Sequence, residues 1–162
     1  MTMVQGIQTS SSPLAGCRHL ALEGMDVHLM DRGRGPNLLC IHGMGTSHFS
    51  WRYNMPYFER SYRMIAPDLP GYGFSDTVHD FGFHIDDYVH LLLDILRVLE
   101  VKQTHVMAHS FGGAIAERLV RNHPKRVDRV ILVGAADLEQ PTLDHNPEGS
   151  KNPLLNSYYD KS

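Results

Sequence analysis

The chain has 162 residues, of which 42% are hydrophobic and 20% are charged, a composition typical of a folded globular protein and not of a disordered one. The net charge of −3 argues against the clustered basic face that nucleic-acid binding requires. Two cysteines do not form a disulfide framework, which favours a reducing compartment and predicts a cytoplasmic protein. No apolar run is long enough to predict a membrane span.

In chain order, a polar, Ser-rich tail over residues 1–16 precedes alternating strand and helix patterns. The predicted strands are 17–23, 25–31, 38–41, 62–66, 104–107 and 127–133, and the predicted helices are 49–60, 85–100 and 111–122. Helix 85–100 has one continuous apolar stripe, whereas Pro56 interrupts helix 49–60. Alternating strands and helices predict an α/β fold, with a mostly parallel sheet and flanking helices.

The segment around Ser110 is the strongest local signal in the chain. A short apolar strand meets this serine, and a helical pattern begins directly after it. Ala108 and Gly112, two residues before and two after, are small enough for a sharp strand-to-helix turn. The pattern predicts a nucleophile elbow, and the alternative is a serine that caps the following helix.

Two further loops follow predicted strands. His42-Gly43-Met44-Gly45 comes after strand 38–41, and residues 68–75 (Asp-Leu-Pro-Gly-Tyr-Gly-Phe-Ser) come after strand 62–66. Open α/β sheets bind their ligands at the carboxyl ends of the strands. We therefore expect these two loops to lie beside the Ser110 turn.

The three motifs resemble the α/β-hydrolase fold family, in the style of its small esterases and carbon–carbon bond hydrolases, over residues 17–136. The resemblance implies that Ser110 is the nucleophile and that the backbone N–H groups of Met44 and Phe111 form the oxyanion hole. His42, Gly43 and Gly45 would support the loop that presents Met44. Epoxide hydrolases of this family have an aspartate at the elbow, so a serine favours acyl-enzyme chemistry on a small carbonyl substrate.

The other members of a catalytic triad are harder to identify. The family order is serine, acid, then histidine on later loops, and an acid and a histidine at those places are missing from this sequence. Asp137 follows strand 127–133 and is a candidate acid. His109 is expected to point away from the site, because the side chains of strand neighbours alternate.

The sequence predicts no cofactor and no metal site. The histidines lack a ligand spacing such as His-Glu-x-x-His, and the Gly-x-Gly fragments lack a complete phosphate-binding signature. We expect residues 17–137 to form a hydrolase core truncated after about six strands and residues 138–162 to begin a lid or cap.

Two functional hypotheses follow. The chain is part of a serine hydrolase that acts on an ester or related carbonyl compound, or it is a truncated, inactive hydrolase-like protein with at most an interaction role. In either case, strand 127–133 would leave an uncovered sheet edge through which chains self-associate.

Overall fold

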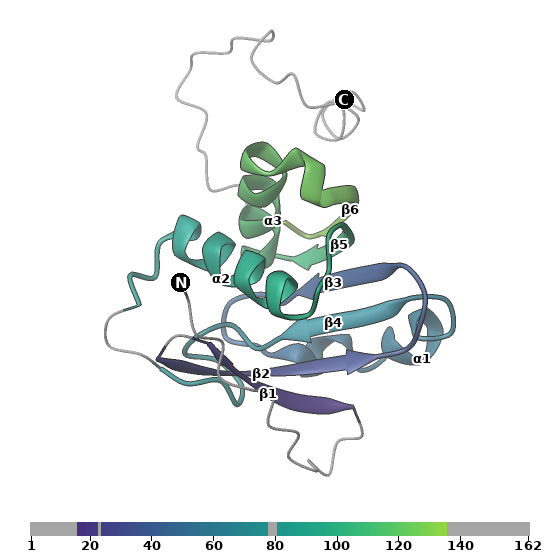
Figure 1. Cartoon of the computed structure of the whole chain (residues 1–162), viewed down its shortest axis with the longest axis horizontal. Helices are drawn as coiled ribbons and strands as arrows, with labels where there is room; N and C mark the ends of the chain where they lie inside the picture. The colour runs from purple at the N-terminus through teal and green to yellow at the C-terminus, as the bar shows by residue number, and fades with distance from the viewer. Residues whose placement is uncertain (1–15, 23, 78–80, 136–162) are drawn as a thin grey trace, which may run out of the picture.

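The computed structural model describes residues 16–22, 24–77 and 81–135. In this part of the chain, six strands form one sheet in the order β1-β2-β4-β3-β5-β6 (Figure 1). The strands are β1 (Cys17–Leu22), β2 (Met25–Arg32), β3 (Asn37–Ile41), β4 (Arg63–Pro67), β5 (Thr104–His109) and β6 (Val127–Val133). The helices are η1 (His48–Trp51), α1 (Met55–Phe58), α2 (Ile85–Val98), α3 (Phe111–Asn122) and η2 (Pro124–Arg126).

The sheet is mixed, with a parallel majority. Strands β4, β3, β5 and β6 are parallel neighbours, while β2 is antiparallel to both β1 and β4. The parallel pairs are joined by crossovers that contain helices, as parallel pairing requires. These observations confirm the predicted α/β class and the mostly parallel sheet.

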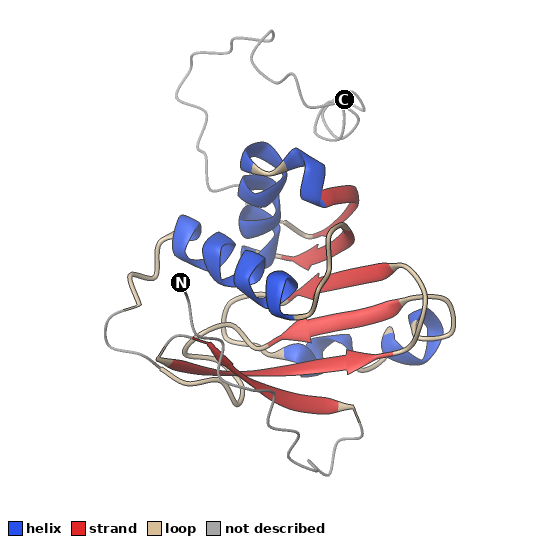
Figure 2. Ribbon diagram, in the orientation of Figure 1, coloured by secondary structure: helices blue, strands red, loops and turns tan. Residues whose placement is uncertain are grey.

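Helices cover both faces of the sheet (Figure 2). Helices α2 and α3 pack on one face, over a core that includes Leu39, Ile41 and Val106. Segments η1 and α1 lie on the other face, over a smaller core around Trp51 and Met64. The apolar stripe of α2 points into the larger core, as its spacing predicted. Among the described residues, no helix is both long enough and apolar enough to cross a membrane.

The predicted helix over 49–60 is wrong. The structure has a 3-10 turn, η1, followed by the single helical turn α1, in which Pro56 occupies the first turn. A proline ring clashes with the carbonyl group four residues earlier, so a helix cannot continue through this position from η1.

Strand β6 lies at the edge of the sheet. Its Val127 is buried, but the side chains of Ile131 and Val133 are 48% and 43% exposed. Within the described residues no strand pairs with β6 on the side away from β5. An apolar strand edge with unpaired backbone groups is a template for pairing with another chain.

We therefore expect the purified chain to self-associate as its concentration rises, and sedimentation velocity measures this directly. Replacing Ile131 and Val133 together by lysine should reduce the association, because charges on an edge strand oppose pairing. Tyr53→Lys, which removes an exposed aromatic side chain away from the edge, is the matched control. A chain that stays monomeric at every concentration would contradict the expectation.

Candidate functional site

The turn between β5 and α3 has an unusual backbone. Ser110 has a φ of +50° and a ψ of −118°, in a region that residues other than glycine rarely adopt. Its N–H donates to the carbonyl group of Val133 (3.1 Å), and its own carbonyl group accepts from the N–H of Gly113 (2.8 Å). These bonds hold the chain in a sharp strand-to-helix turn with the serine at its tip.

The Ser110 side chain does not cap the helix. Ser110 occupies the position before the first residue of α3, yet its side chain makes no capping hydrogen bond. The interpretation of this serine as a helix cap is therefore wrong. The Ser110 hydroxyl group therefore has no capping role in α3.

The small residues around the turn are required by close packing. A Cβ atom added to Gly112 would lie 2.5 Å from the carbonyl oxygen of Ile41 and 2.7 Å from that of His42. Ala108 is fully buried and pairs with Ile41 across the parallel strands β5 and β3. The first turn of α3 thus lies directly against the end of β3, where the His-Gly loop begins.

The His-Gly loop contacts the Ser110 turn. A Cβ atom on Gly43 would lie 3.2 Å from the Cβ of Ser110 and 2.8 Å from the His109 Nδ1 atom. The His109 ring therefore lies against this loop and not away from it. The alternation rule did not foresee this contact, because it orders side chains within β5 and says nothing of the loop that follows the neighbouring strand β3.

Met44, the next residue of the loop, has a side chain that is 65% exposed. Gly45 follows with a φ of +71°, a left-handed conformation that glycine adopts without strain. On the other side of the turn, Phe111 is the first residue of α3, and the first N–H groups of a helix have no partner within the helix.

His42 is buried and uses both ring nitrogen atoms. The backbone N–H of Leu69 donates to its Nε2 atom (2.9 Å), so the proton is on Nδ1, which donates to the carbonyl group of Gly43 (2.8 Å). Burial lowers the pKa of His42, which keeps the ring neutral. Neither nitrogen is free to take a proton from Ser110.

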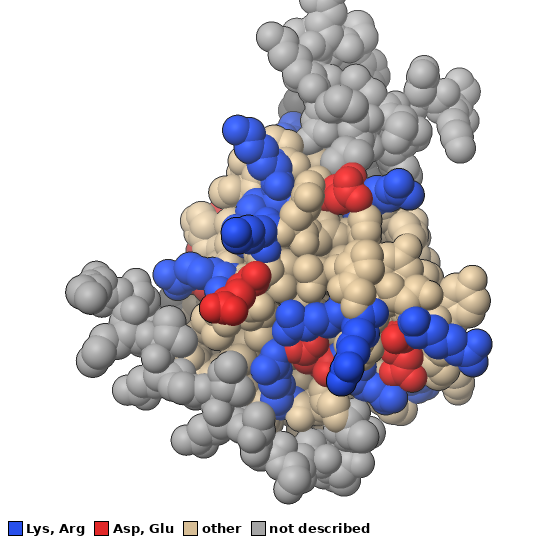
Figure 3. All heavy atoms as spheres, turned by 45° about the vertical axis from the view of Figure 1, so that its right-hand side comes forward, with Lys and Arg blue, Asp and Glu red and all other residues tan. Residues whose placement is uncertain are grey.

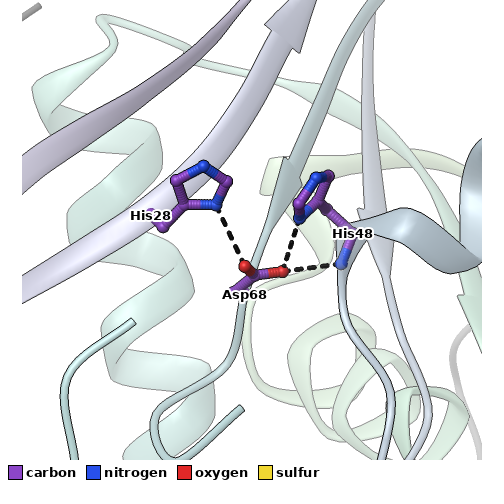
Figure 4. Close-up of side chains that lie close together, drawn as sticks. All are labelled: His28, His48 and Asp68. Carbon is purple, nitrogen blue, oxygen red and sulfur yellow. Dashed lines mark hydrogen bonds and ion pairs between the residues drawn. The ribbon is translucent and has the colours of Figure 1, made fainter. Parts of the chain in front are cut away.

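The loop after β4 contains a buried carboxylate with two histidine partners (Figure 4). The His28 Nδ1 atom lies 3.0 Å from Asp68 Oδ2, and the His48 Nδ1 atom lies 2.9 Å from Asp68 Oδ1. The backbone N–H groups of His48 and Phe74 also donate to this carboxylate, at 2.6 and 3.0 Å. We call His28, His48 and Asp68 the Asp68 cluster.

Four hydrogen bonds keep Asp68 ionised. Burial by itself raises the pKa of a carboxyl group, but the bonds from His28 and His48 outweigh it, and the pKa of Asp68 lies well below its ordinary range. The Asp68 side chain is fully buried. The cluster therefore holds a buried negative charge that joins β2, η1 and the loop after β4.

Sequence reasoning missed His28 and His48, although Asp68 stood in a recognised loop. The three residues are 20 and 40 positions apart and come from an antiparallel strand, a 3-10 turn and a loop. No local spacing could have indicated this group. It brings together two imidazoles and a carboxylate, a set of side chains that could hold a metal ion.

The predicted acid, Asp137, lies outside the described residues. Within the residues that the structure does describe, no hydrogen bond joins a histidine ring to the Ser110 side chain. The described part of the site thus brings together the serine turn, the His-Gly loop and the Phe111 N–H group, without a base.

Comparisons with known proteins agree with this arrangement. The alpha/beta hydrolase fold family matches residues 36–156. A 2-hydroxymuconate semialdehyde hydrolase of Pseudomonas sp. (strain CF600) is 38% identical over 137 residues, which are 83% of this chain and 48% of that protein. A 2-hydroxy-6-oxo-2,4-heptadienoate hydrolase of Pseudomonas putida is 36% identical, over 75% of this chain and 45% of that protein. The chain therefore spans less than half the length of these two relatives.

Solved structures give the same result. A meta-cleavage product hydrolase of Pseudomonas fluorescens IP01 has a TM-score of 0.67 and 33% identity, covering 69% of this chain and 42% of that one. An epoxide hydrolase of Vigna radiata has a TM-score of 0.70 and 29% identity, and the match covers 76% of this chain and 40% of that one. With its sheet order, its serine turn and these similarities, the chain belongs to the alpha/beta hydrolase fold family.

Proposed function

We propose that this chain supplies the nucleophile and the oxyanion hole of a serine hydrolase that acts on a small carbonyl substrate. The single observation that carries the proposal is the backbone of Ser110, whose φ of +50° lies at a strand-to-helix turn against the His-Gly loop. Strain of this kind costs about 1–3 kcal/mol and persists where a function needs it. Asp137 stays a proposed acid.

The proposed chemistry begins with attack of the Ser110 oxygen on the substrate carbonyl carbon. The hydroxyl proton passes to a base, and the carbonyl oxygen becomes negatively charged. The N–H groups of Met44 and Phe111 would donate to that oxygen, and one such donor contributes roughly 3 kcal/mol to transition-state stabilisation. The positive end of the α3 dipole acts in the same direction.

The relatives narrow the substrate class. The names of the two Pseudomonas relatives describe hydrolases of a semialdehyde and of an oxo-dienoate, which are carbonyl compounds. Other similar proteins are epoxide hydrolases, but Ser110 stands where epoxide hydrolases of this family have an aspartate. A carbonyl substrate, cleaved at an ester or a carbon–carbon bond, therefore fits this chain better than an epoxide.

The surface supports a small-molecule substrate over a nucleic acid. On the face drawn in Figure 3, basic side chains lie next to acidic ones and do not form a continuous basic area. Asp31, for example, forms ion pairs with both Arg18 and Arg63, and Arg32 pairs with Glu59.

Cys17 and Cys40 are free thiols, which supports the proposed cytoplasmic location.

A second candidate is an inactive hydrolase-like protein. The observation that favours it is the lack of a histidine hydrogen-bonded to the Ser110 side chain within the described residues. Loss of the base costs serine hydrolases on the order of a million-fold in kcat, while the oxyanion hole and substrate binding retain roughly a thousand-fold acceleration.

Fluorophosphonate labelling tests the proposal and separates the two candidates. We expect intact-mass spectrometry to find one adduct on the 162-residue chain, lost in Ser110→Ala and kept in Ser61→Ala, a control at an exposed serine. Hydrolysis of p-nitrophenyl acetate that depends on Ser110 at a rate typical of a complete triad would identify an active enzyme. The absence of both an adduct and Ser110-dependent turnover would identify the inactive form, because phosphonylation of the hydroxyl group also needs a base. An adduct that survives Ser110→Ala would refute the assignment of the nucleophile.

A further inference from the structure

The three residues of the Asp68 cluster are potential ligands of a single metal ion, although they lie far apart in the sequence. One ligand atom each from His28, His48 and Asp68 lies within 4.8 Å of the other two. We propose that these three residues form a binding site for a divalent transition-metal ion of the Zn²⁺ class. The proposal is independent of the role of Ser110.

The distances are close to those of a coordinated ion. Zinc bonds to histidine nitrogen and carboxylate oxygen are about 2.0–2.2 Å long, so ligand atoms around one ion lie roughly 3–3.5 Å apart. The two nitrogen-to-oxygen distances in the cluster are 3.0 and 2.9 Å. The first distance goes to Oδ2 and the second to Oδ1, so the side chains must shift to bring both rings and the carboxylate onto one ion.

The charge of the cluster favours a cation. Asp68 is ionised and fully buried, and its side-chain partners in the described structure are two imidazoles, with no lysine or arginine among them. The carboxylate of Asp31, by contrast, is compensated in the usual way, by ion pairs with Arg18 and Arg63. A divalent ion would neutralise a buried charge that is otherwise compensated only by hydrogen bonds.

The ligand set indicates the class of ion. Imidazole nitrogen suits zinc and its neighbours in the first transition series, whereas magnesium and calcium prefer sites made wholly of oxygen ligands. Three protein ligands would leave a coordination position for water. Two histidines and one carboxylate therefore select a zinc-like ion over the hard cations.

Coordination of an ion would change the tautomers of His28 and His48. The ion accepts a lone pair from the Nδ1 atoms of His28 and His48 and from an Asp68 oxygen, and each Nδ1 proton moves to the Nε2 atom of the same ring. For His48, that Nε2 atom faces the Cys17 sulfur at 3.9 Å, which can act as a weak acceptor. The imidazoles stay neutral, and only their tautomers change.

The ligands are already held in place. The backbone N–H of His28 donates to the Ser75 hydroxyl group (2.9 Å), and that hydroxyl donates to the Asp68 carbonyl group (2.7 Å). Outer hydrogen bonds of this kind orient metal ligands. The ring of Phe74, a residue that is 65% exposed, lies beside the His28 ring, with centroids 5.1 Å apart.

The test is a zinc titration of the untagged 162-residue chain after treatment with a chelator. We expect isothermal titration calorimetry to find one specific site and the melting temperature to rise with Zn²⁺ concentration. His48→Gln, which keeps a polar side chain beside Asp68, should weaken Zn²⁺ binding by at least roughly tenfold. His90→Gln, at an exposed histidine on α2, is the matched control and should bind as the unchanged chain does.

Imidazole ¹⁵N NMR of the unchanged chain tests the same proposal without a variant. Zn²⁺ should convert two Nδ1 atoms from protonated to metal-bound nitrogen and should protonate the two Nε2 atoms. If neither pair responds to Zn²⁺, or if His48→Gln binds Zn²⁺ as tightly as His90→Gln, the cluster is only a hydrogen-bonded group and the proposal is overturned.

Discussion

Replacing Asp68 with asparagine is expected to lower the free energy of unfolding by about 3 kcal/mol, a large effect for a substitution that hardly changes the side-chain volume. The carboxylate accepts four hydrogen bonds, from two imidazoles and two backbone N–H groups. Asparagine replaces one of the two oxygens with an NH₂ group that faces donors. Urea unfolding followed by circular dichroism measures the difference.

Asp94→Asn is the matched control for this change. Asp94 pairs with Arg97 at 2.9 Å on the surface of α2, and both side chains are about half exposed. Exposed pairs of this kind contribute little, so the control should change the free energy of unfolding by less than about 0.5 kcal/mol. Equal losses in the two variants would show that the Asp68 hydrogen bonds do not stabilise the fold.

The same residue should determine part of the acid sensitivity. Because the pKa of Asp68 is lowered in the folded chain, its stabilising contribution is fully present above the ordinary value of 3.8 and is lost as the pH falls through the lower folded value. The titratable groups that interact with it are His28 and His48, through hydrogen bonds, and His42 and Cys17, through its charge. The unchanged chain should therefore lose more stability below about pH 4 than Asp68→Asn does.

Gly112→Ala is the second substitution with a large expected effect, and two terms oppose each other. Alanine favours a helix over glycine by about 1 kcal/mol. Against this, the new Cβ would lie 2.5 and 2.7 Å from two backbone carbonyl oxygens, and backbone atoms cannot turn aside as side chains do. Overpacking costs up to about 3 kcal/mol, so after the helix gain is subtracted we expect a net loss of up to about 2 kcal/mol in unfolding free energy.

Gly112→Ala should also reduce fluorophosphonate labelling at Ser110, because it separates the first turn of α3 from the His-Gly loop. Gly24→Ala is the control: its φ of +73° strains an alanine by about 1 kcal/mol, but nothing lies within 4 Å of the new atom. Labelling should be unchanged in that variant. A stabilised, fully labelled Gly112→Ala variant would contradict the packing of α3 against the end of β3.

Much of the fold could be predicted because its signals are local. Helix 111–122 and strand 127–133 were predicted with the observed bounds, since a strained turn and Pro124 mark their limits. The convergence of the three loops followed from the rule that parallel strands end at one edge of the sheet. The contact between Gly43 and Ser110 agrees with that expectation.

The features that the sequence did not predict have a common cause. Each depends on contacts between elements, which the spacing of residues along the chain does not reveal. The ring of His109 lies against the His-Gly loop because β3, which leads into that loop, is the neighbour of β5. His28 lies beside Asp68 because β2 pairs with β4, and His48 reaches the same carboxylate from the 3-10 turn η1. Sequence patterns determine which face a residue occupies within one element, but not which side chains from different elements meet.

The length of the loops closed by the Asp68 cluster also has a kinetic consequence. Its hydrogen bonds join residues 20 and 40 positions apart, so the chain bears the entropy of loop closure before these bonds can form. We expect these bonds to form after the folding transition state, and contacts that form late influence the rate of unfolding and hardly affect the rate of folding. The cluster is therefore expected to determine how slowly the folded chain opens.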